Sequence, residues 1–173
     1  MSVDNIRLLA KYSRKTNDLM NSYIRKITDD EWNRNFSGFF KSIHELCSHI
    51  YICDFNWLKR FKNLRSFNTL SGEFFSKNYS FSETIFADKD EYILMRDGLD
   101  NIIMEFTGEI NDNDLEKTLT FTDSKGNINN RKMESLMTHV FNHQTHHRGM
   151  ISLYLEMTGI ENSFTDSLYN TDI

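Results

Sequence analysis

Apolar residues recur at helical spacing in four long segments of the chain. At about 100° per residue, steps of three and four positions place side chains on one face of a helix. The pattern predicts helices over about residues 4–27, 38–61, 89–110 and 133–157, which together predict an all-α four-helix bundle. The apolar positions in the four segments are Leu9, Tyr12, Thr16, Leu19, Tyr23, Ile27; Phe39, Ile43, Leu46, Cys47, Ile50, Trp57; Tyr92, Met95, Leu99, Ile102, Phe106, Ile110; and Leu136, Val140, His143, His147, Met150, Tyr154.

The second and third predicted helices are joined by a long irregular segment, residues 62–87. Neighbouring antiparallel helices need a much shorter connection. We therefore expect a crossover that runs down the length of the bundle. Its aromatic residues would pin it to the surface or cover a site; they are Phe67, Phe74, Phe75 and Phe81.

A small β-hairpin is predicted just before the fourth helix. Leu119 and Phe121 alternate with threonines, and Asp-Ser-Lys-Gly at 123–126 is typical of a turn. Two strands alone are only marginally stable, so the hairpin should lean on the helices.

Several helix ends carry recognisable signals. Asp4 can cap the first helix, and Asp88 with Glu91 has the spacing of a capping box at the start of the third. Gly159 can end the fourth helix by adopting a left-handed conformation.

Composition agrees with a single helical domain spanning residues 1–173. The chain has no proline and seven glycines, so helix breakers are scarce. Its net charge is −5 with both signs mixed, and no Lys/Arg stripe is present to neutralise phosphates. This argues against nucleic acid as a partner.

The cysteines and the N-terminal sequence bear on localisation. Cys47 and Cys53 lie six residues apart and would point in different directions on one helix, so we expect no disulfide between them. The N-terminus lacks the apolar run of a signal peptide, and no segment approaches the ~20 apolar residues that span a bilayer. A reduced cytoplasmic protein with no membrane partner is the expectation.

The segment HVFNHQTHHRGM, residues 139–150, holds four of the six histidines. His143 and His147 are four apart on the apolar stripe, so both imidazoles can reach one metal ion. The second helix offers a third ligand, His49 or His44, which lie at similar angles from its stripe, so periodicity does not choose between them. Three imidazoles with one open position are typical of a catalytic site, and Zn²⁺, Ni²⁺ or Fe²⁺ would suit them.

Other residues near these histidines are candidates for supporting roles. His139 and His146 lie on the shoulder of the stripe and could orient the ligands or simply pack. Asp54 lies near the centre of the second helix's stripe, where a carboxylate requires a cationic or histidine partner. Arg148 lies far round the fourth helix, and is interpreted as a surface charge or as a bridge to Asp54 or to a dimer partner. Cys53 is interpreted as a small core residue, with a ligand or nucleophile role as the alternative.

Two polar residues and one phenol complete the predictions for the fourth helix. Thr145 and Ser152 are expected on its solvent side. Tyr154 is expected in the core, where its hydroxyl needs a hydrogen-bond partner.

Two motifs resemble the DinB family. FKSIHELCSHIYICDFNWLKRF, residues 40–61, is similar to the family's second-helix pattern, and HVFNHQTHHRGM is similar to its His-x-x-x-His-x-x-His-His-Arg-Gly signature. The tail FTDSLY, residues 164–169, resembles the family's C-terminal Thr-Asp segment. The chain departs from the pattern at Met150, where glutamine usually follows Arg-Gly, and in lacking the prolines often found before Thr-Asp.

The resemblance implies that His49, His143 and His147 bind the metal, and it is the resemblance that prefers His49 to His44. It also implies a homodimer. Related proteins include transferases that use a low-molecular-weight thiol as cosubstrate, so the expectation is a metal-dependent thiol S-transferase, or a hydrolase, acting on a small-molecule substrate. The alternative is a non-catalytic stress-response dimer whose metal site is structural or vestigial. A di-iron protein is disfavoured because the fourth helix contains no Glu-x-x-His.

Overall fold

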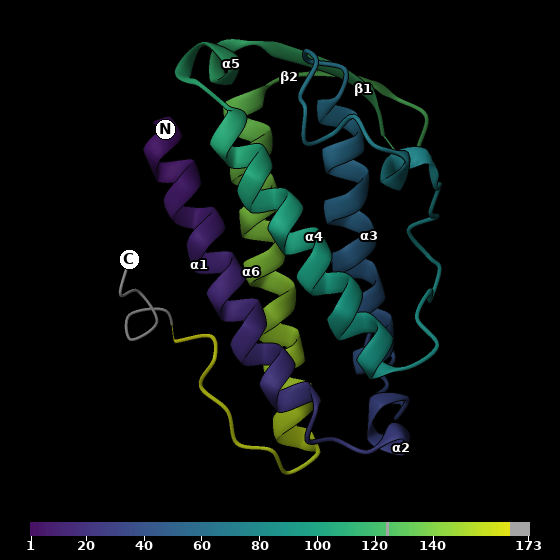
Figure 1. The fold of residues 1–173 in the computed structure, drawn as a ribbon. Helices are drawn as coiled ribbons and strands as arrows, with labels where there is room; N and C mark the ends of the chain where they lie inside the picture. The colour runs from purple at the N-terminus through teal and green to yellow at the C-terminus, as the bar shows by residue number, and fades with distance from the viewer. Residues whose placement is uncertain (124, 167–173) are drawn as a thin grey trace.

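Four long helices lie side by side and enclose the core (Figure 1). The computed structural model describes residues 1–123 and 125–166. The long helices are α1 (Val3–Ile24), α3 (Ile43–Phe61), α4 (Lys89–Glu109) and α6 (Met133–Met157). They pack in a ring, in which α1 contacts α4, α4 contacts α3, α3 contacts α6 and α6 contacts α1. The predicted four-helix bundle is confirmed. The end of the tail that resembles the family, from residue 167 on, lies outside the described residues.

Short elements occupy the connections. They are α2 (Asp29–Trp32), the 3₁₀ turn η1 (Glu73–Ser76), α5 (Asp112–Glu116), β1 (Thr118–Thr122) and β2 (Ile128–Lys132). The strands pair antiparallel, with Thr118 opposite Lys132, and form the predicted hairpin before α6. As expected, the hairpin leans on the helices: Leu119 is buried, and the Phe121 ring packs 5.2 Å from that of Trp57.

The last long helix has the predicted bounds, and its end has a clear cause. Gly159 has a φ of +87°, and the N–H groups of Gly159 and Ile160 donate to the carbonyl oxygens of Glu156 and Leu155. This is the Schellman arrangement, in which a left-handed glycine lets the chain turn back over the last helical carbonyls.

Two helix starts differ from the prediction. Ser2, rather than Asp4, caps α1 by accepting from the N–H of Asn5. Helix α3 begins at Ile43 rather than near residue 38, because the Ser42 side chain caps it. Phe39 therefore lies outside the helix and is 90% exposed, so its assignment to the apolar stripe is wrong. At α4, Asp88 accepts from the Glu91 N–H as predicted. The Glu91 carboxylate, however, accepts from the N–H of Ala87 and not from that of Asp88, so the predicted capping box is incomplete.

The buried face of α1 is more polar than its apolar stripe predicted. Leu9, Leu19 and Tyr23 pack at the margin of the core. The fully buried positions are Val3, Ile6, Ala10, Ser13, Thr16, Asn17, Met20, Asn21 and Ile24. The helix is therefore rotated relative to the prediction, and two of its buried polar side chains, Ser13 and Asn17, form hydrogen bonds to α6 and α4 inside the bundle.

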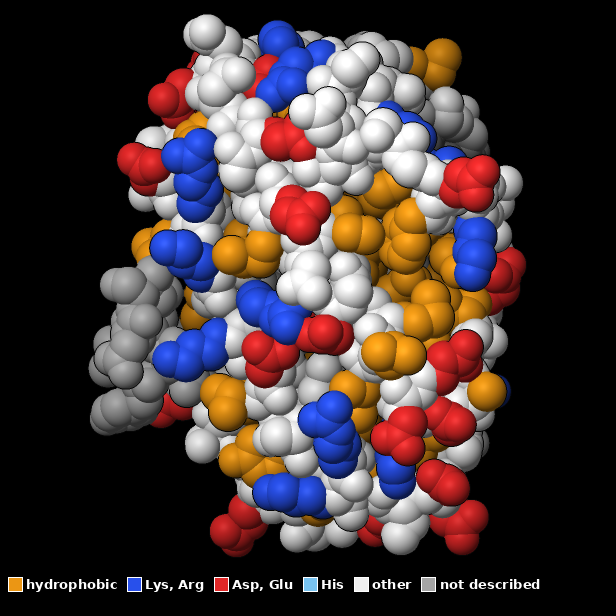
Figure 2. Space-filling view, in the orientation of Figure 1, with side chains coloured by type: hydrophobic (Ala, Val, Ile, Leu, Met, Phe, Trp, Pro, Cys, Tyr) orange, Lys and Arg blue, Asp and Glu red, His pale blue; other side chains and the backbone are white. Residues whose placement is uncertain are grey.

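The crossover between α3 and α4 is attached by aromatic residues, as predicted. Phe67 and Phe75 are buried, whereas Phe74 is 38% exposed. On the face shown in Figure 2, hydrophobic side chains gather between α4 and this crossover, and charges of both signs are scattered over the rest. Among the described residues, no helix combines the length and apolar character that crossing a bilayer requires.

Candidate metal centre

Helices α3 and α6 bring three imidazoles to one point inside the bundle. The Nε2 atoms of His49 and His143 are 3.2 Å apart, and those of His143 and His147 are 3.0 Å apart. The rings of His49 and His147 are also adjacent, with centroids 4.7 Å apart. The residues that the two motifs singled out are therefore brought together.

Hydrogen bonding alone does not satisfy this arrangement. A neutral imidazole nitrogen carries either one hydrogen or one lone pair, so Nε2 of His143 can pair with only one of its two neighbours. Two nitrogens that each lie about 2.1 Å from a shared ion are about 3.0–3.4 Å apart at bond angles between 90° and 109°. The observed separations of 3.0 and 3.2 Å lie in that interval. The donor set therefore fits a transition-metal ion.

Burial keeps these imidazoles neutral. Removal from water, reinforced by the neighbouring histidines, lowers the pKa of His143 to about 4 and that of His147 to about 3. Burial also lowers the pKa of His49. Because a metal binds the neutral form of imidazole, all three rings are in the ligating form near pH 7.

His44 does not join this cluster. Its ring stacks on Trp32 with centroids 5.0 Å apart, and its Nδ1 lies 3.1 Å from Oδ1 of Asn33. The choice that periodicity left open is thus made by packing, which places His49 with the α6 histidines.

Cys53 lies closer to the cluster than the sequence indicated. It is buried, as a core residue should be, but its Sγ is 3.5 Å from Nε2 of His49. Ligand atoms of His49, Cys53 and His143 all lie within 4.8 Å of one another. Burial, and then the nearby Asp54 carboxylate, raise the pKa of the Cys53 thiol to about 12. The one-turn spacing from His49 was the signal that could have placed Cys53 here.

The other two histidines of the α6 motif flank the cluster from exposed positions. The His139 ring is 5.5 Å from that of Trp57 and 5.9 Å from that of His143. The His146 ring is 4.8 Å from that of His147. Both rings therefore lie next to the three clustered imidazoles, but neither contributes a candidate metal ligand.

Asp54 has the cationic partner that its buried position required. Its Oδ2 accepts from Arg96 of α4 at 2.7 Å and from Nε2 of Gln144 of α6 at 2.9 Å. Arg96 also donates to Asp100 at 2.6 Å. The sequence had not identified Arg96 or Gln144, because one helical wheel does not reveal which helix faces which.

Arg148 is not a surface charge. It is 2% exposed and donates to Oγ of Ser13 at 2.7 Å and to Oδ1 of Asn17 at 3.2 Å. It does not form the predicted bridge to Asp54, since Arg96 holds that place. Ser152 is also buried, contrary to prediction, and donates to Oδ1 of Asn162 at 2.7 Å.

These contacts form a polar network among the described residues that touches every long helix. Its members are Ser13, Asn17, Asp54, Arg96, Asp100, Gln144 and Arg148. Gln144 and Arg148 directly follow His143 and His147, and Asp54 directly follows Cys53. The network therefore fixes the rotation of α3 and α6 at the positions beside the candidate ligands.

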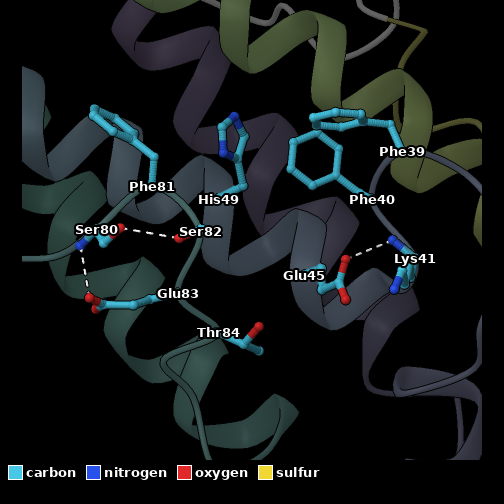
Figure 3. Close-up of a pocket in the computed structure, with 10 residues that line it drawn as sticks. All are labelled: Phe39, Phe40, Lys41, Glu45, His49, Ser80, Phe81, Ser82, Glu83 and Thr84. Atoms are coloured by element: carbon cyan, nitrogen blue, oxygen red, sulfur yellow. Dashed lines mark hydrogen bonds between the residues drawn. The ribbon is translucent and has the colours of Figure 1, made fainter. Parts of the chain in front are cut away.

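A pocket opens beside His49. It has a volume of about 700 Å³ and is lined by Phe39, Phe40, Lys41, Glu45, His49, Ser80, Phe81, Ser82, Glu83 and Thr84. Figure 3 shows His49 between Phe81 and Phe40, with the polar side chains across from them. The sequence anticipated an aromatic cover from the crossover, and Phe81 takes that position.

The Phe40 side of the pocket is held from α6. The Tyr154 hydroxyl donates to the Phe40 carbonyl at 2.7 Å, as its burial required, and the Tyr154 ring stacks on Phe36. The Phe40 ring in turn lies 4.6 Å from that of His49.

Comparisons with known proteins agree with the fold. The family model described as "DinB family" matches residues 1–173. Protein DinB of Bacillus subtilis is 22% identical over 158 residues, which cover 91% of this chain and 88% of that protein. A crystal structure of a DinB-like protein from Bacillus subtilis superposes with a TM-score of 0.64 at 14% identity, covering 89% of this chain and 94% of the other.

Proposed function

The chain belongs to the DinB family, and on that premise we propose that it is a metal-dependent enzyme whose divalent ion is bound by His49, His143 and His147. The observation that carries the proposal is that Nε2 of His143 lies 3.2 Å from Nε2 of His49 and 3.0 Å from Nε2 of His147, next to a pocket. A divalent ion bound there lowers the pKa of a water molecule or thiol, so that a nucleophile is available near neutral pH.

The pocket supports a catalytic rather than a structural role. Structural metal sites are enclosed by protein ligands, whereas catalytic sites keep a position open to substrate. His49 belongs both to the imidazole cluster and to the pocket wall, so a molecule in the pocket lies next to the candidate ligands.

The pocket walls favour a substrate with two kinds of surface. Phe40 and Phe81 offer apolar faces that pack against a hydrophobic body and exclude water near His49. Ser80, Ser82 and Thr84 offer hydroxyl groups to a polar end. These features suit a small molecule whose reactive centre lies toward the histidines.

The proposed reaction is transfer of a low-molecular-weight thiol to an electrophilic small molecule, with hydrolysis by water as the variant. Family membership supports thiol transfer, and the neutral imidazoles suit borderline-soft ions such as Zn²⁺, Ni²⁺ or Fe²⁺. Incubating the metal-loaded protein with a thiol and an electrophile, with and without the thiol, distinguishes the two reactions.

The metal assignment is tested by measuring bound metal in purified protein. We expect about one divalent ion per chain in the unaltered protein, and loss of that ion in His49→Ala, His143→Ala and His147→Ala, because each substitution removes one of three ligands. His44→Ala is the matched control, since it removes the other histidine of α3 but leaves the cluster untouched. Full metal content in all three ligand variants would contradict the assignment.

A further inference from the structure

A second pocket lies at the end of α3, and its lining is strongly cationic. It has a volume of about 470 Å³, within the range of small-molecule sites, and is lined by Asn56, Lys59, Arg60, Lys62, Asn63 and Asn78. Three of these side chains are positively charged, and the other three are carboxamides that carry N–H donors. The whole chain has a net charge of −5, so this concentration of positive charge runs against its overall balance.

Helical spacing and the crossover together form this pocket. Four lining residues recur at steps of three and four, which places them on one face at the end of α3; they are Asn56, Lys59, Arg60 and Asn63. The Asn56 amide donates to the Tyr79 carbonyl at 3.3 Å. Lys59 donates to the Lys77 carbonyl at 2.8 Å and to Oδ1 of Asn78 at 2.6 Å. These bonds hold the crossover against α3, so the cations line a hollow between two segments instead of an open helix face.

Arg60 is held by aromatic rings and leaves most of its donors unused. Its guanidinium carbon lies 4.7 Å from the centroid of the Trp57 ring, 5.3 Å from that of Phe121 and 5.8 Å from that of Phe81. Among the described residues its one hydrogen-bond acceptor is the Thr122 carbonyl, at 3.4 Å. The rings therefore fix the plane of the guanidinium, and its remaining N–H groups are available to an oxyanion.

The charges in this pocket are not neutralised by the part of the chain that the structure describes. The ion pairs found there include none of Lys59, Arg60 and Lys62. Burial lowers the pKa of Arg60, and the nearby Cys53 and Asp123 offset that effect only in part. An anion therefore gains charge-assisted hydrogen bonds here without displacing an existing ion pair.

The position of these cations at the end of a helix does not account for them. Cations near a helix C-terminus commonly offset the helix dipole. Here, however, Lys59 and Arg60 donate to carbonyl groups of the crossover and of the hairpin. Their side chains are thus directed into the junction of three segments.

We propose that this pocket is a binding site for a small oxyanion, whose carboxylate or phosphate group is held by Lys59, Arg60 and Lys62. Arg60 is the central residue, because a planar guanidinium pairs with two oxygen atoms at once. The inference goes beyond the proposed function and does not depend on a metal ion. The site adjoins the pocket beside His49, since Arg60 packs on Phe81, which lines that pocket.

Isothermal titration calorimetry of the full chain, freed of metal by a chelator, tests the site. Sodium phosphate and sodium succinate are titrated separately near pH 7, with the ionic strength held constant by NaCl because salt screens exposed charges. We expect saturable binding of at least one probe. The two arms show whether the pocket prefers a phosphate or a carboxylate group.

Matched variants locate the bound anion. Arg60→Met should weaken binding by about tenfold or more, because it removes hydrogen bonds to a charged group. Lys62→Met, on an exposed side chain, should weaken it by about twofold to fivefold. Arg34→Met is the control and should bind like the unaltered protein. Arg34 also lies over a phenyl ring and donates to one carbonyl oxygen, but it is not part of the pocket lining.

His143→Ala separates this proposal from the proposed function, because it removes a candidate metal ligand and should keep full anion affinity. The proposal is overturned if neither probe binds saturably, if Arg34→Met weakens binding as much as Arg60→Met, or if His143→Ala abolishes binding. If Arg60→Met does not fold, unchanged affinity in Lys62→Met overturns it. The metal assignment is tested by metal content, so it stands or fails separately.

Discussion

A single hydrogen bond positions the part of the pocket wall that is formed by Phe39 and Phe40. Phe39 and Phe40 belong to the segment before α3, which follows Ser37 with its positive φ of 59°. This segment is held by the bond from the Tyr154 hydroxyl to the Phe40 carbonyl. One hydroxyl on α6 thus ties the pocket wall to the helix that carries two candidate ligands.

Gly38 should be intolerant of a side chain for the same reason. A Cβ there would lie 2.0 Å from the Tyr154 hydroxyl oxygen. We expect Gly38→Ala to destabilise the protein by about 1–3 kcal/mol, because the tyrosine must leave its position. The loss should be smaller in a Tyr154→Phe background, where the clashing oxygen is gone.

A double-mutant cycle by urea denaturation measures this coupling. Gly108→Ala serves as the control, because nothing lies within 4 Å of a Cβ at that helical position. It should be neutral or stabilising by up to about 1 kcal/mol. Equal destabilisation by Gly38→Ala in both backgrounds would rule out the proposed clash.

At the scale of the helices, buried polar contacts set how the elements face one another. Asp54 on α3, Arg96 on α4 and Gln144 on α6 form bonds across three helices. Asn17 of α1 joins through Asp100 at 3.0 and 3.1 Å. Such contacts have fixed partners, whereas apolar packing tolerates rotation, so they specify one arrangement of the bundle.

Arg96 should be the most sensitive member of this network. Arg96→Met leaves the carboxylates of Asp54 and Asp100 buried without the guanidinium that neutralises both. Breaking a buried ion pair from one side typically costs about 3–5 kcal/mol, and we expect a loss of that order in chemical denaturation. Lys132→Met, which breaks the exposed pair with Glu116, should leave stability nearly unchanged. Comparable effects of the two substitutions would mean that the network does not stabilise the bundle.

Across the whole molecule, the candidate ligands come from α3 and α6, which are separated in the chain by α4 and the hairpin. An ion bound by both helices would stabilise only the folded state, since the unfolded chain does not hold the three imidazoles together. The homodimer implied by the family resemblance stays a prediction, which sedimentation of the full chain would test.

Metal should therefore stabilise the fold. With free Zn²⁺ at a hundred times its Kd, the gain in unfolding free energy is about 2.7 kcal/mol. This should raise the Tm by several degrees in a protein of this size, as measured by calorimetry with and without zinc. His143→Ala should show no such rise, and His44→Ala should show the full one. A zinc-independent Tm in the unaltered protein would argue against the site.

Most of the elements could be predicted because their signals are local. The bounds of α6 follow from its apolar spacing and Gly159, and the hairpin follows from alternation around a turn. Ser42, which caps α3 by accepting from the N–H of Glu45, was an equally local signal for the start of that helix. The prediction missed it because Phe39 fits the apolar spacing of α3, and the helix was extended back to include it. Apolar spacing and capping residues thus locate the long helices, and the start of α3 was misplaced because these two signals disagreed there.

The sequence by itself determined the four helices, the crossover and the shared face of His143 and His147, because helical periodicity depends only on residues a few positions apart. The tertiary structure decided the rest. It turned the polar face of α1 toward the core, buried Arg148, paired Asp54 with Arg96, and placed His49 rather than His44 opposite the α6 histidines. These outcomes depend on which faces of separate helices meet, and that is set by packing and hydrogen-bond partners far apart in the chain.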